Sequence, residues 1–499
     1  MKRLIAATFL LISLMTGCGG GGGGGGGGGT GAGAAAPAAA PAASPALPLS
    51  TETTLFWAYD LVSGAPYQLS ATKVGEGTSC SVYLESGATV SASAVTAIVS
   101  QFDSTIYPNV TAAFGPVPSP GVDGDPKVVL LLLNIRDGFA SGSSSYVAGY
   151  FDPLNEYEPS QVATSNKREM IYMNVNPATG IVPGSAEFGA TLAHELQHVI
   201  HWEQKTRRQG LQDDAWLDEA MATVAPTYCG YGTDWDRVRT FELAPATSLT
   251  NWDYKSINSY GVVYMWAQYL KDQLGGGIFR RMLENGQTGI ASVNGALAAV
   301  GYTWDFSGVF RNWAVANASG NAVTWLEHPE WSYTSVDTRS GNFSGVSLPG
   351  LLNRARLNAA TLQPLDPWSV GYYAYTPGSS TTGTVTWTPA GTEKASFYDA
   401  GGGLVVYDLA PGASTSFTTR GYLIVQNPSG TDFSSGATVA RTSLDPVATP
   451  GELVAAMELS PLARSMSVQT GQPQHVCIDS ALKAREKALR AAGTLPAFR

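Results

Sequence analysis

The stretch "TLAHELQHVIHW", residues 191–202, decides how the rest of the chain is interpreted. It contains three histidines, although the whole chain of 499 residues has only 5. His194 and His198 are four positions apart, so on a helix both imidazoles would lie on one face, with Glu195 beside them. This H-E-x-x-H spacing is the one with which a helix presents two histidines to a zinc ion next to a general base.

The residues around the motif predict a helix from Ser185 to about Lys205. Ser185 is a suitable N-cap, and Glu187 lies favourably in the first turn. Apolar residues recur along one side of this helix, namely Phe188, Leu192, Leu196, Val199 and Ile200. One face is therefore expected to pack in the core and to fix the direction of the histidines.

Imidazole nitrogen suits zinc, and a catalytic zinc ion takes three protein ligands and one water. The ion lowers the pKa of that water to about 7, and a nearby carboxylate can accept its proton. We therefore expect His194 and His198 to be metal ligands and Glu195 to be the general base. The motif also occurs by chance, but its position on a helix in a histidine-poor chain favours a metal site.

The third ligand has three candidates, which are His201, Glu203 and Glu219. His201 lies about one turn beyond His198, and one straight helix is poorly suited to supply three ligands to a tetrahedral ion. A neighbouring helix could instead deliver Glu219 from the opposite side. We favour Glu219, and we expect His201 to be structural or to line the cleft.

Glu219 lies in "AWLDEAMATV", residues 215–224. The pattern predicts a helix from about Asp214 to Ala225, stopped by Pro226. The apolar neighbours of Glu219 on this helix indicate that a lone carboxylate there needs a partner. Two further residues nearby, Asp218 and Thr223, are candidates to hold a zinc-bound histidine in place.

With both helices identified, residues from about 75 to 317 resemble the hyicolysin-like neutral zinc metallopeptidases, which belong to the gluzincins. "WLDEAMA" is similar to the W-L-N-E-G-F-A type of segment that supplies the glutamate ligand in gluzincins. The other supporting segments are "AGYFDP", "SNKREMIYMNVNP", "TLAHELQHVIHW" and "SYGVVYMWAQYL". The resemblance implies a thermolysin-like catalytic core with one zinc ion and endopeptidase activity on proteins or peptides.

Peptide hydrolysis also needs a group that holds the developing oxyanion. In related gluzincins, a tyrosine near the start of a later helix does this. "NSYGVVYMWAQYLKDQLGG", residues 258–276, resembles that helix, with Tyr260 at the matching place and Tyr264 one turn further as the alternative. His328 and His475 lie in a predicted loop and in the tail, where we expect surface positions.

The fold class expected from these patterns is α+β. "KVVLLLLNI" (127–135) predicts a buried strand, "REMIYMNVN" (168–176) predicts a strand at the edge or inside a sheet, and 94–114 predicts a helix. A mixed sheet with the two motif helices would form a zincin core. From about Asp337, short aromatic and β-branched runs between Gly and Pro turns predict an all-β sandwich.

The first residues predict export. Lys2 and Arg3 precede a short apolar run, and "LMTGC" resembles a bacterial lipobox in which Cys18 would be acylated. A tether follows, so we expect an outer-membrane-anchored or cell-surface lipoprotein, with full secretion as the alternative.

The expected domains are a lipoprotein-type signal peptide (1–18), a Gly/Ala/Pro-rich tether (19–50), a β-rich N-terminal region (51–115), a zinc metallopeptidase domain (116–335), a β-sandwich (336–450) and a C-terminal tail with one helix (451–499).

The charge composition limits the classes of molecule that the protein is expected to bind. The net charge is −10 and no Lys/Arg cluster is present, so nucleic-acid binding is not expected. We expect a protein or peptide substrate, and contact with a membrane only through a lipid on Cys18. The acidic loop "GVDGDP", with Asp123 and Asp125, offers carboxylates to Ca²⁺ but falls far short of a full calcium loop, so a plain turn is favoured.

Three further cysteines, Cys80, Cys229 and Cys477, allow one disulfide with a free thiol, or none.

Two other functions are compatible with parts of this sequence pattern of a metal motif followed by a sandwich. A surface adhesin would use the metallopeptidase-like part as a scaffold and the sandwich as a binding domain. A metal-dependent hydrolase of another bond would share the same metal site, since a peptide substrate is favoured only through the family resemblance.

Overall fold

A run of six apolar residues, Val128–Leu133, forms β4, the strand around which the first half of the chain is built. Its alternate side chains enter two different cores on opposite faces of one sheet. Burial on both faces explains why the run is continuously apolar rather than alternating. In this computed structural model, the described residues are 49–50, 53–140, 145–320, 328–377, 382–399, 405–430, 437–442, 474–475 and 477–495, all within one compact unit, Ala43–Arg499.

The sheet around β4 is mixed, which confirms the α+β class. The pairs β3–β4 and β4–β7 are parallel, and the other neighbours are antiparallel. In sheet order, its strands are β1 (Thr53–Asp60), β2 (Ala65–Glu76), β3 (Cys80–Glu85), β4, β7 (Met170–Asn174) and β6 (Gly149–Phe151). Strands from the regions 51–115 and 116–335 therefore belong to one sheet.

The edge of this sheet differs from one of the two sequence expectations. β7, which carries "REMIYMNVN", lies between β4 and β6 and is an inner strand. The edge strand on that side is β6, preceded by the short strand β5 (Ser145–Tyr146). The edge of the mixed sheet on that side is therefore made by β6 and not by 168–176, while β5 belongs to a separate two-stranded sheet.

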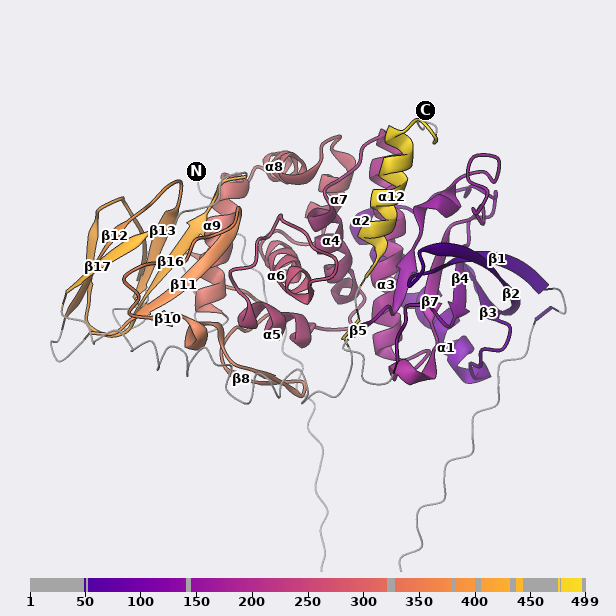
Figure 1. The fold of residues 1–499 in the computed structure, drawn as a ribbon, viewed down its shortest axis with the longest axis horizontal. Coiled ribbons are helices and arrows are strands. Elements are labelled where there is room, and N and C mark those ends of the chain that lie inside the picture. The colour runs from indigo at the N-terminus through magenta and orange to yellow at the C-terminus, as the bar shows by residue number, and fades with distance from the viewer. Residues whose placement is uncertain are drawn as a thin grey trace, which may run out of the picture. The chain divides into compact units, whose positions relative to one another are not determined.

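Helices cover one face of the sheet and then form a layer of their own (Figure 1). A π-helical turn, Phe102–Ile106, joins α1 to α2, and a second one, Trp202–Arg207, extends α3. The helices are α1 (Ala92–Gln101), α2 (Tyr107–Phe114), α3 (Ala186–His201), α4 (Ala215–Tyr228), α5 (Trp235–Leu243), α6 (Ile257–Leu274), α7 (Gly277–Glu284), α8 (Gly289–Ala299) and α9 (Phe306–Ser319). A search of the described helices finds no candidate membrane-spanning segment.

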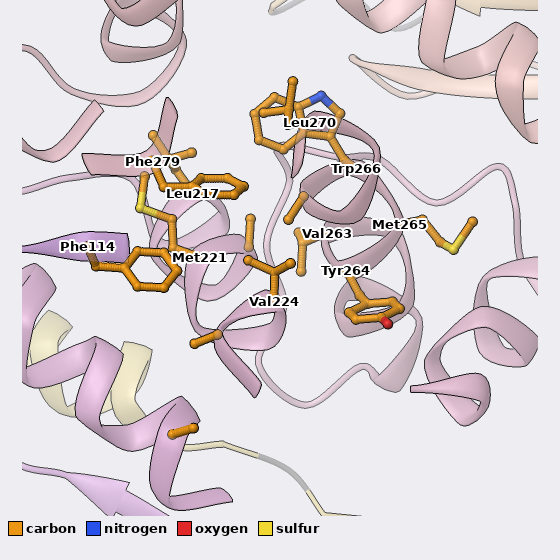
Figure 2. Close-up of a cluster of buried hydrophobic side chains, with 14 of the residues drawn as sticks. Phe114, Leu217, Met221, Val224, Val263, Tyr264, Met265, Trp266, Leu270 and Phe279 are labelled. Atoms are coloured by element: carbon orange, nitrogen blue, oxygen red, sulfur yellow. The ribbon is translucent and has the colours of Figure 1, made fainter. Parts of the chain in front are cut away.

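Apolar packing fixes α4 against α6. Figure 2 shows Val224 of α4 beside Val263 of α6, while Met221 on the same helix extends toward Phe114 and Phe279. The indole rings of Trp216 and Trp266 meet edge to face, with centroids 5.3 Å apart. These contacts hold the helix that carries Glu219 in a fixed position next to α3.

Two helix boundaries test the local predictions. Ser185 caps α3 as expected, because its hydroxyl accepts a hydrogen bond from the Phe188 amide at 3.2 Å. The prediction that Pro226 stops α4 is wrong, since the helix continues to Tyr228. Proline lacks the N–H that would donate to the carbonyl of the preceding turn, and the packing of α4 in the core carries the helix past this lost hydrogen bond.

The second half of the described chain forms two facing sheets with their own apolar core, as the sandwich prediction expected. One short pair, β10–β11, is parallel, and the remaining pairs are antiparallel. The first sheet contains β10 (Arg356–Leu357), β11 (Ser369–Tyr375), β16 (Gly421–Asn427), β13 (Lys394–Asp399) and β14 (Val405–Leu409), and the second contains β15 (Ser414–Phe417), β12 (Gly383–Thr388) and β17 (Thr438–Thr442). A separate hairpin is formed by β8 (Gly341–Phe343) and β9 (Val346–Leu348).

The C-terminal residues return to the first half of the molecule. β18 (Gln474–His475) pairs in parallel with β5, and α12 (Asp479–Ala491) lies alongside α3, in yellow in Figure 1. Leu482 of α12 is buried in the core on the second face of the mixed sheet. The predicted tail is thus a part of the packed structure next to α3.

The close approach of β6 to α3 gives a first prediction. A Cβ on Gly149 would lie 2.9 Å from the Met173 sulfur and 3.2 Å from Cγ2 of Thr191 on α3. We expect Gly149→Ala to lower the free energy of unfolding by about 1–3 kcal/mol through overpacking, measured by urea denaturation. Gly277→Ala is the control, because its Cβ meets nothing within 4 Å. Equal losses of stability in both variants would contradict the packing argument.

Candidate metal centre

The two motif helices bring three expected ligand atoms together. Nε2 of His194 and Nε2 of His198 are 3.2 Å apart, and each lies 3.6 Å from Oε2 of Glu219. His198 and Glu219 are completely buried, and His194 is 12% exposed in its side chain. Of the three sequence candidates for the third position, Glu219 is the one that faces both imidazoles.

The other two candidates are engaged elsewhere. The Glu203 carboxylate forms ion pairs with Arg207 and Arg208. The His201 ring lies between two carboxylates, with Nε2 at 3.2 Å from Asp213 and Nδ1 at 3.1 Å from Asp218. His201 is therefore part of the support around the centre.

The geometry of this trio fits a zinc ion. With bonds of about 2.0–2.1 Å, a tetrahedral zinc ion holds neighbouring N and O ligand atoms about 3.3–3.4 Å apart. The three separations here are 3.2, 3.6 and 3.6 Å. Both carboxylate oxygens of Glu219 are buried without a hydrogen-bond partner among the described residues. Such oxygens are costly to bury unless a cation or donor faces them, so the donor set fits a metal.

Charge at the centre is concentrated in a water-poor environment. Burial raises the pKa of Glu219. Burial also raises the pKa of Glu195 well above its usual range, and the neighbouring carboxylates of Asp479 and Glu219 add to this. Oε2 of Glu195 is another buried oxygen without a hydrogen-bond partner among the described residues. The described residues around the site thus supply too few hydrogen-bond donors for all of its carboxylate oxygens.

Asp218 orients His198. Its Oδ1 lies 3.0 Å from Nδ1 of His198, which leaves Nε2 directed at the centre. Burial alone would raise the pKa of Asp218, but the charges of His201, Lys483 and His198 outweigh it and hold that pKa well below its usual range. A charged carboxylate at Nδ1 makes the imidazole a better metal ligand. Thr223, the other supporting candidate, donates instead to the Ala220 carbonyl within α4.

A fourth side chain reaches the centre from the C-terminal segment. Sγ of Cys477 lies 3.6 Å from Nε2 of His198, and the ligand atoms of His194, His198, Glu219 and Cys477 all lie within 4.8 Å of one another. Burial raises the pKa of the Cys477 thiol well above its usual value, with the Asp479 charge adding to it. A coordinating metal overrides this effect, because it deprotonates a bound thiol.

The expected tyrosine is close to the centre but is already bonded. The Tyr260 hydroxyl donates to the Cys477 carbonyl oxygen, with an O···O distance of 2.8 Å, and lies 3.0 Å from the Cys477 amide nitrogen. The alternative, Tyr264, accepts from the Asp234 amide at 2.9 Å. Tyr264 lines a cleft of about 340 Å³ whose lining also includes His194 and Glu195.

Other expected sites lie apart from this centre. Asp123 and Asp125 accept hydrogen bonds from backbone amides within their own turn, and neither belongs to a cluster of metal-ligating side chains among the described residues. His328 stacks on Trp331. The three described cysteines, Cys80, Cys229 and Cys477, are all free and buried. The predicted signal peptide with Cys18, and the tether up to residue 48, lie outside the described residues.

Sequence reasoning missed three residues of the centre: Cys477, Asp479 and Lys483. Nζ of Lys483 forms an ion pair with Asp218 and lies 3.0 Å from Nδ1 of His198. All three lie in residues 451–499, which the sequence predicts to be a tail with one helix. Its apolar residues at helical spacing, such as Leu482 and Leu489, indicated that the helix packs on a surface, but not on which one.

No protein-family model matches the chain. Over 199 residues the chain is 34% identical to the neutral metalloprotease ShpI of Staphylococcus hyicus. The match covers 37% of this chain and 44% of that protein, so the chain spans less than half the length of this relative. The similarity and the buried cluster of histidine, glutamate and cysteine together support a relationship to neutral metallopeptidases.

The hydrogen bond to His198 generates a second prediction. We expect Asp218→Asn to weaken metal binding about 10–100-fold, because a neutral amide supports the imidazole less well than a carboxylate. Competition with a chromogenic chelator measures this affinity. The matched control is Asp213→Asn, which removes a buried carboxylate that contacts His201 and not His198. An equal loss of affinity in both variants would contradict the role of Asp218.

Proposed function

We propose that this chain is an exported zinc-dependent endopeptidase of the gluzincin type. His194, His198 and Glu219 would hold one zinc ion between α3 and α4. The observation that carries the proposal is the buried convergence of two imidazole nitrogens and an otherwise unpartnered carboxylate at separations suited to zinc. The similarity to a neutral metalloprotease supports peptide bonds as the substrate class.

The chain's own groups supply the remaining chemistry. When bound, zinc lowers the pKa of a water molecule and polarises the substrate carbonyl. Glu195, beside the ligands on α3, would accept the proton of the attacking water and pass it to the leaving amine.

The cleft beside the centre provides room for an extended peptide. It runs past β5 and α3 and is lined by Tyr146, Thr191, His194 and Arg237, among others. The edge of β5, which pairs with β18 in this structure, would offer backbone groups to a substrate strand once β18 is displaced. Tyr260 would stabilise the oxyanion once its hydroxyl is free of the Cys477 backbone.

The place of action is part of the same proposal. The apolar N-terminal run and the lipobox-like "LMTGC" favour export, followed by acylation of Cys18. The Gly-rich tether would then let the folded unit stand away from an outer membrane or cell surface.

The proton acceptor gives a third prediction. Glu195→Gln should lower casein hydrolysis by about 10²–10⁴-fold while zinc stays bound, because the amide cannot accept a proton. Hydrolysis is followed by release of soluble peptides and zinc by atomic absorption. Glu284→Gln, on an exposed residue of α7 that does not line the cleft, should leave the rate unchanged. Full activity of the Glu195 variant would contradict the role of Glu195 as the proton acceptor.

The third ligand gives a fourth prediction. Glu219→Ala, made in a chain that also carries Cys477→Ala because that sulfur reaches the same centre, should reduce bound zinc well below one ion per chain after dialysis, since two imidazoles alone hold the ion weakly. Glu203→Ala is the comparison, because it removes the rival buried glutamate that pairs with Arg207 and Arg208. If zinc content stays the same without Glu219, the third ligand lies elsewhere.

A further inference from the structure

The segment 474–495 enters the candidate centre, although it lies far from α3 and α4 in sequence. Cys477 is 3% exposed, and its sulfur is one of four ligand-type atoms gathered within 4.8 Å. The other three are those of His194, His198 and Glu219. The buried Glu219 oxygens, which lack a hydrogen-bond partner among the described residues, are an independent sign that this cluster receives a cation.

The position of the sulfur matches a metal ligand. A tetrahedral zinc ion with a bond of about 2.3 Å to sulfur and about 2.0–2.1 Å to nitrogen separates these two atoms by about 3.5–3.6 Å. The observed distance from Cys477 Sγ to His198 Nε2 is 3.6 Å. Thiolate is also a preferred zinc ligand, alongside imidazole and carboxylate.

Resting on the function proposed above, we propose that Cys477 is the fourth zinc ligand and that it holds the enzyme latent. Its thiolate takes the place that the attacking water needs. On coordination the thiol proton leaves, and Oδ2 of Asp479, 2.7 Å from Sγ, is positioned to accept it. The sulfur would replace the water as a ligand of the zinc, so no oxidant or reductant would be needed.

The backbone of the segment also occupies the positions that a substrate would use. The Cys477 carbonyl receives the hydrogen bond of the Tyr260 hydroxyl. β18 pairs with β5, residue for residue at Gln474–Ser145 and His475–Tyr146. An added strand at this edge denies it to any other extended peptide. The fourth metal position, the oxyanion group and the sheet edge are thus taken by the same segment.

Buried polar contacts fix the register of the segment. Oδ1 of Asp479 accepts from the Phe151 amide at 2.7 Å, and Lys483 pairs with Asp218. One turn further, the Glu486 carboxylate accepts from the Tyr157 hydroxyl and from Nε1 of Trp202. These groups would be costly to bury in any other register, so the position of Cys477 is specified and not incidental.

Cobalt substitution of the full chain tests the ligand directly. A cobalt–thiolate bond adds a charge-transfer absorption in the near ultraviolet that His and Glu ligands do not produce. We expect this absorption in the wild-type protein and in Cys80→Ala, whose buried thiol lies on β3 away from the centre. It should be absent in Cys477→Ala. A cobalt-loaded wild type without the absorption overturns the inference.

The rate of casein hydrolysis tests whether Cys477 holds the enzyme latent. Cys477→Ala should keep about one zinc ion per chain through its remaining three ligands, and should hydrolyse casein about tenfold faster than the wild type or more. Cys80→Ala should match the wild type. If Cys477→Ala binds zinc and loses the absorption but gains no activity over a wild type that is itself active, the latency is refuted.

Failure of the proposed function gives a different result. Adding Glu195→Gln to Cys477→Ala should abolish the gained hydrolysis. A wild-type chain that binds neither zinc nor cobalt would refute the metal centre itself. Metal binding with the thiolate absorption, but no hydrolysis of any peptide by Cys477→Ala, would refute the peptidase and leave the fourth ligand standing.

Discussion

Burial of negative charge around His198 is the constraint on which the site depends. Glu195, Glu219 and Asp479 come from three different helices and lie in an interior with little water. Taking such carboxylates out of solvent costs several kcal/mol each unless positive charge or donors face them. Lys483 supplies one positive charge through Asp218, and the proposed divalent ion would supply the rest. Metal binding would therefore stabilise the packing of α3, α4 and α12, because it would offset the cost of burying their carboxylates.

Local patterns predicted the parts of the structure that local physics controls. The N-cap at Ser185, the apolar stripe of α3 and the continuous run of β4 each depend on neighbours within a few residues. The relation of His194 to His198 is of the same kind, because helical periodicity alone brings their rings together. Glu219 needed one further step, the packing of two helices that are adjacent in sequence.

Residues brought in from a distance could not be predicted in this way. Cys477, Asp479 and Lys483 reach the centre because α12 packs beside α3, and no pattern in residues 474–495 specifies that partner. The inner position of β7 likewise depends on which strands pair, which strand composition does not encode. Pro226 within α4 shows the opposite limit, where tertiary packing carries a helix past a local stop signal.

The place of α12 in the chain has a consequence for the order in which the protein is made. About 250 residues separate the end of α4 at Tyr228 from the start of α12 at Asp479. At about 5–20 residues per second, the ribosome completes α12 roughly 10–50 s after α4. Of the four proposed ligands, the three on α3 and α4 are thus synthesised well before the thiol of Cys477. Cys477 would therefore be the last of the proposed ligands to reach the centre.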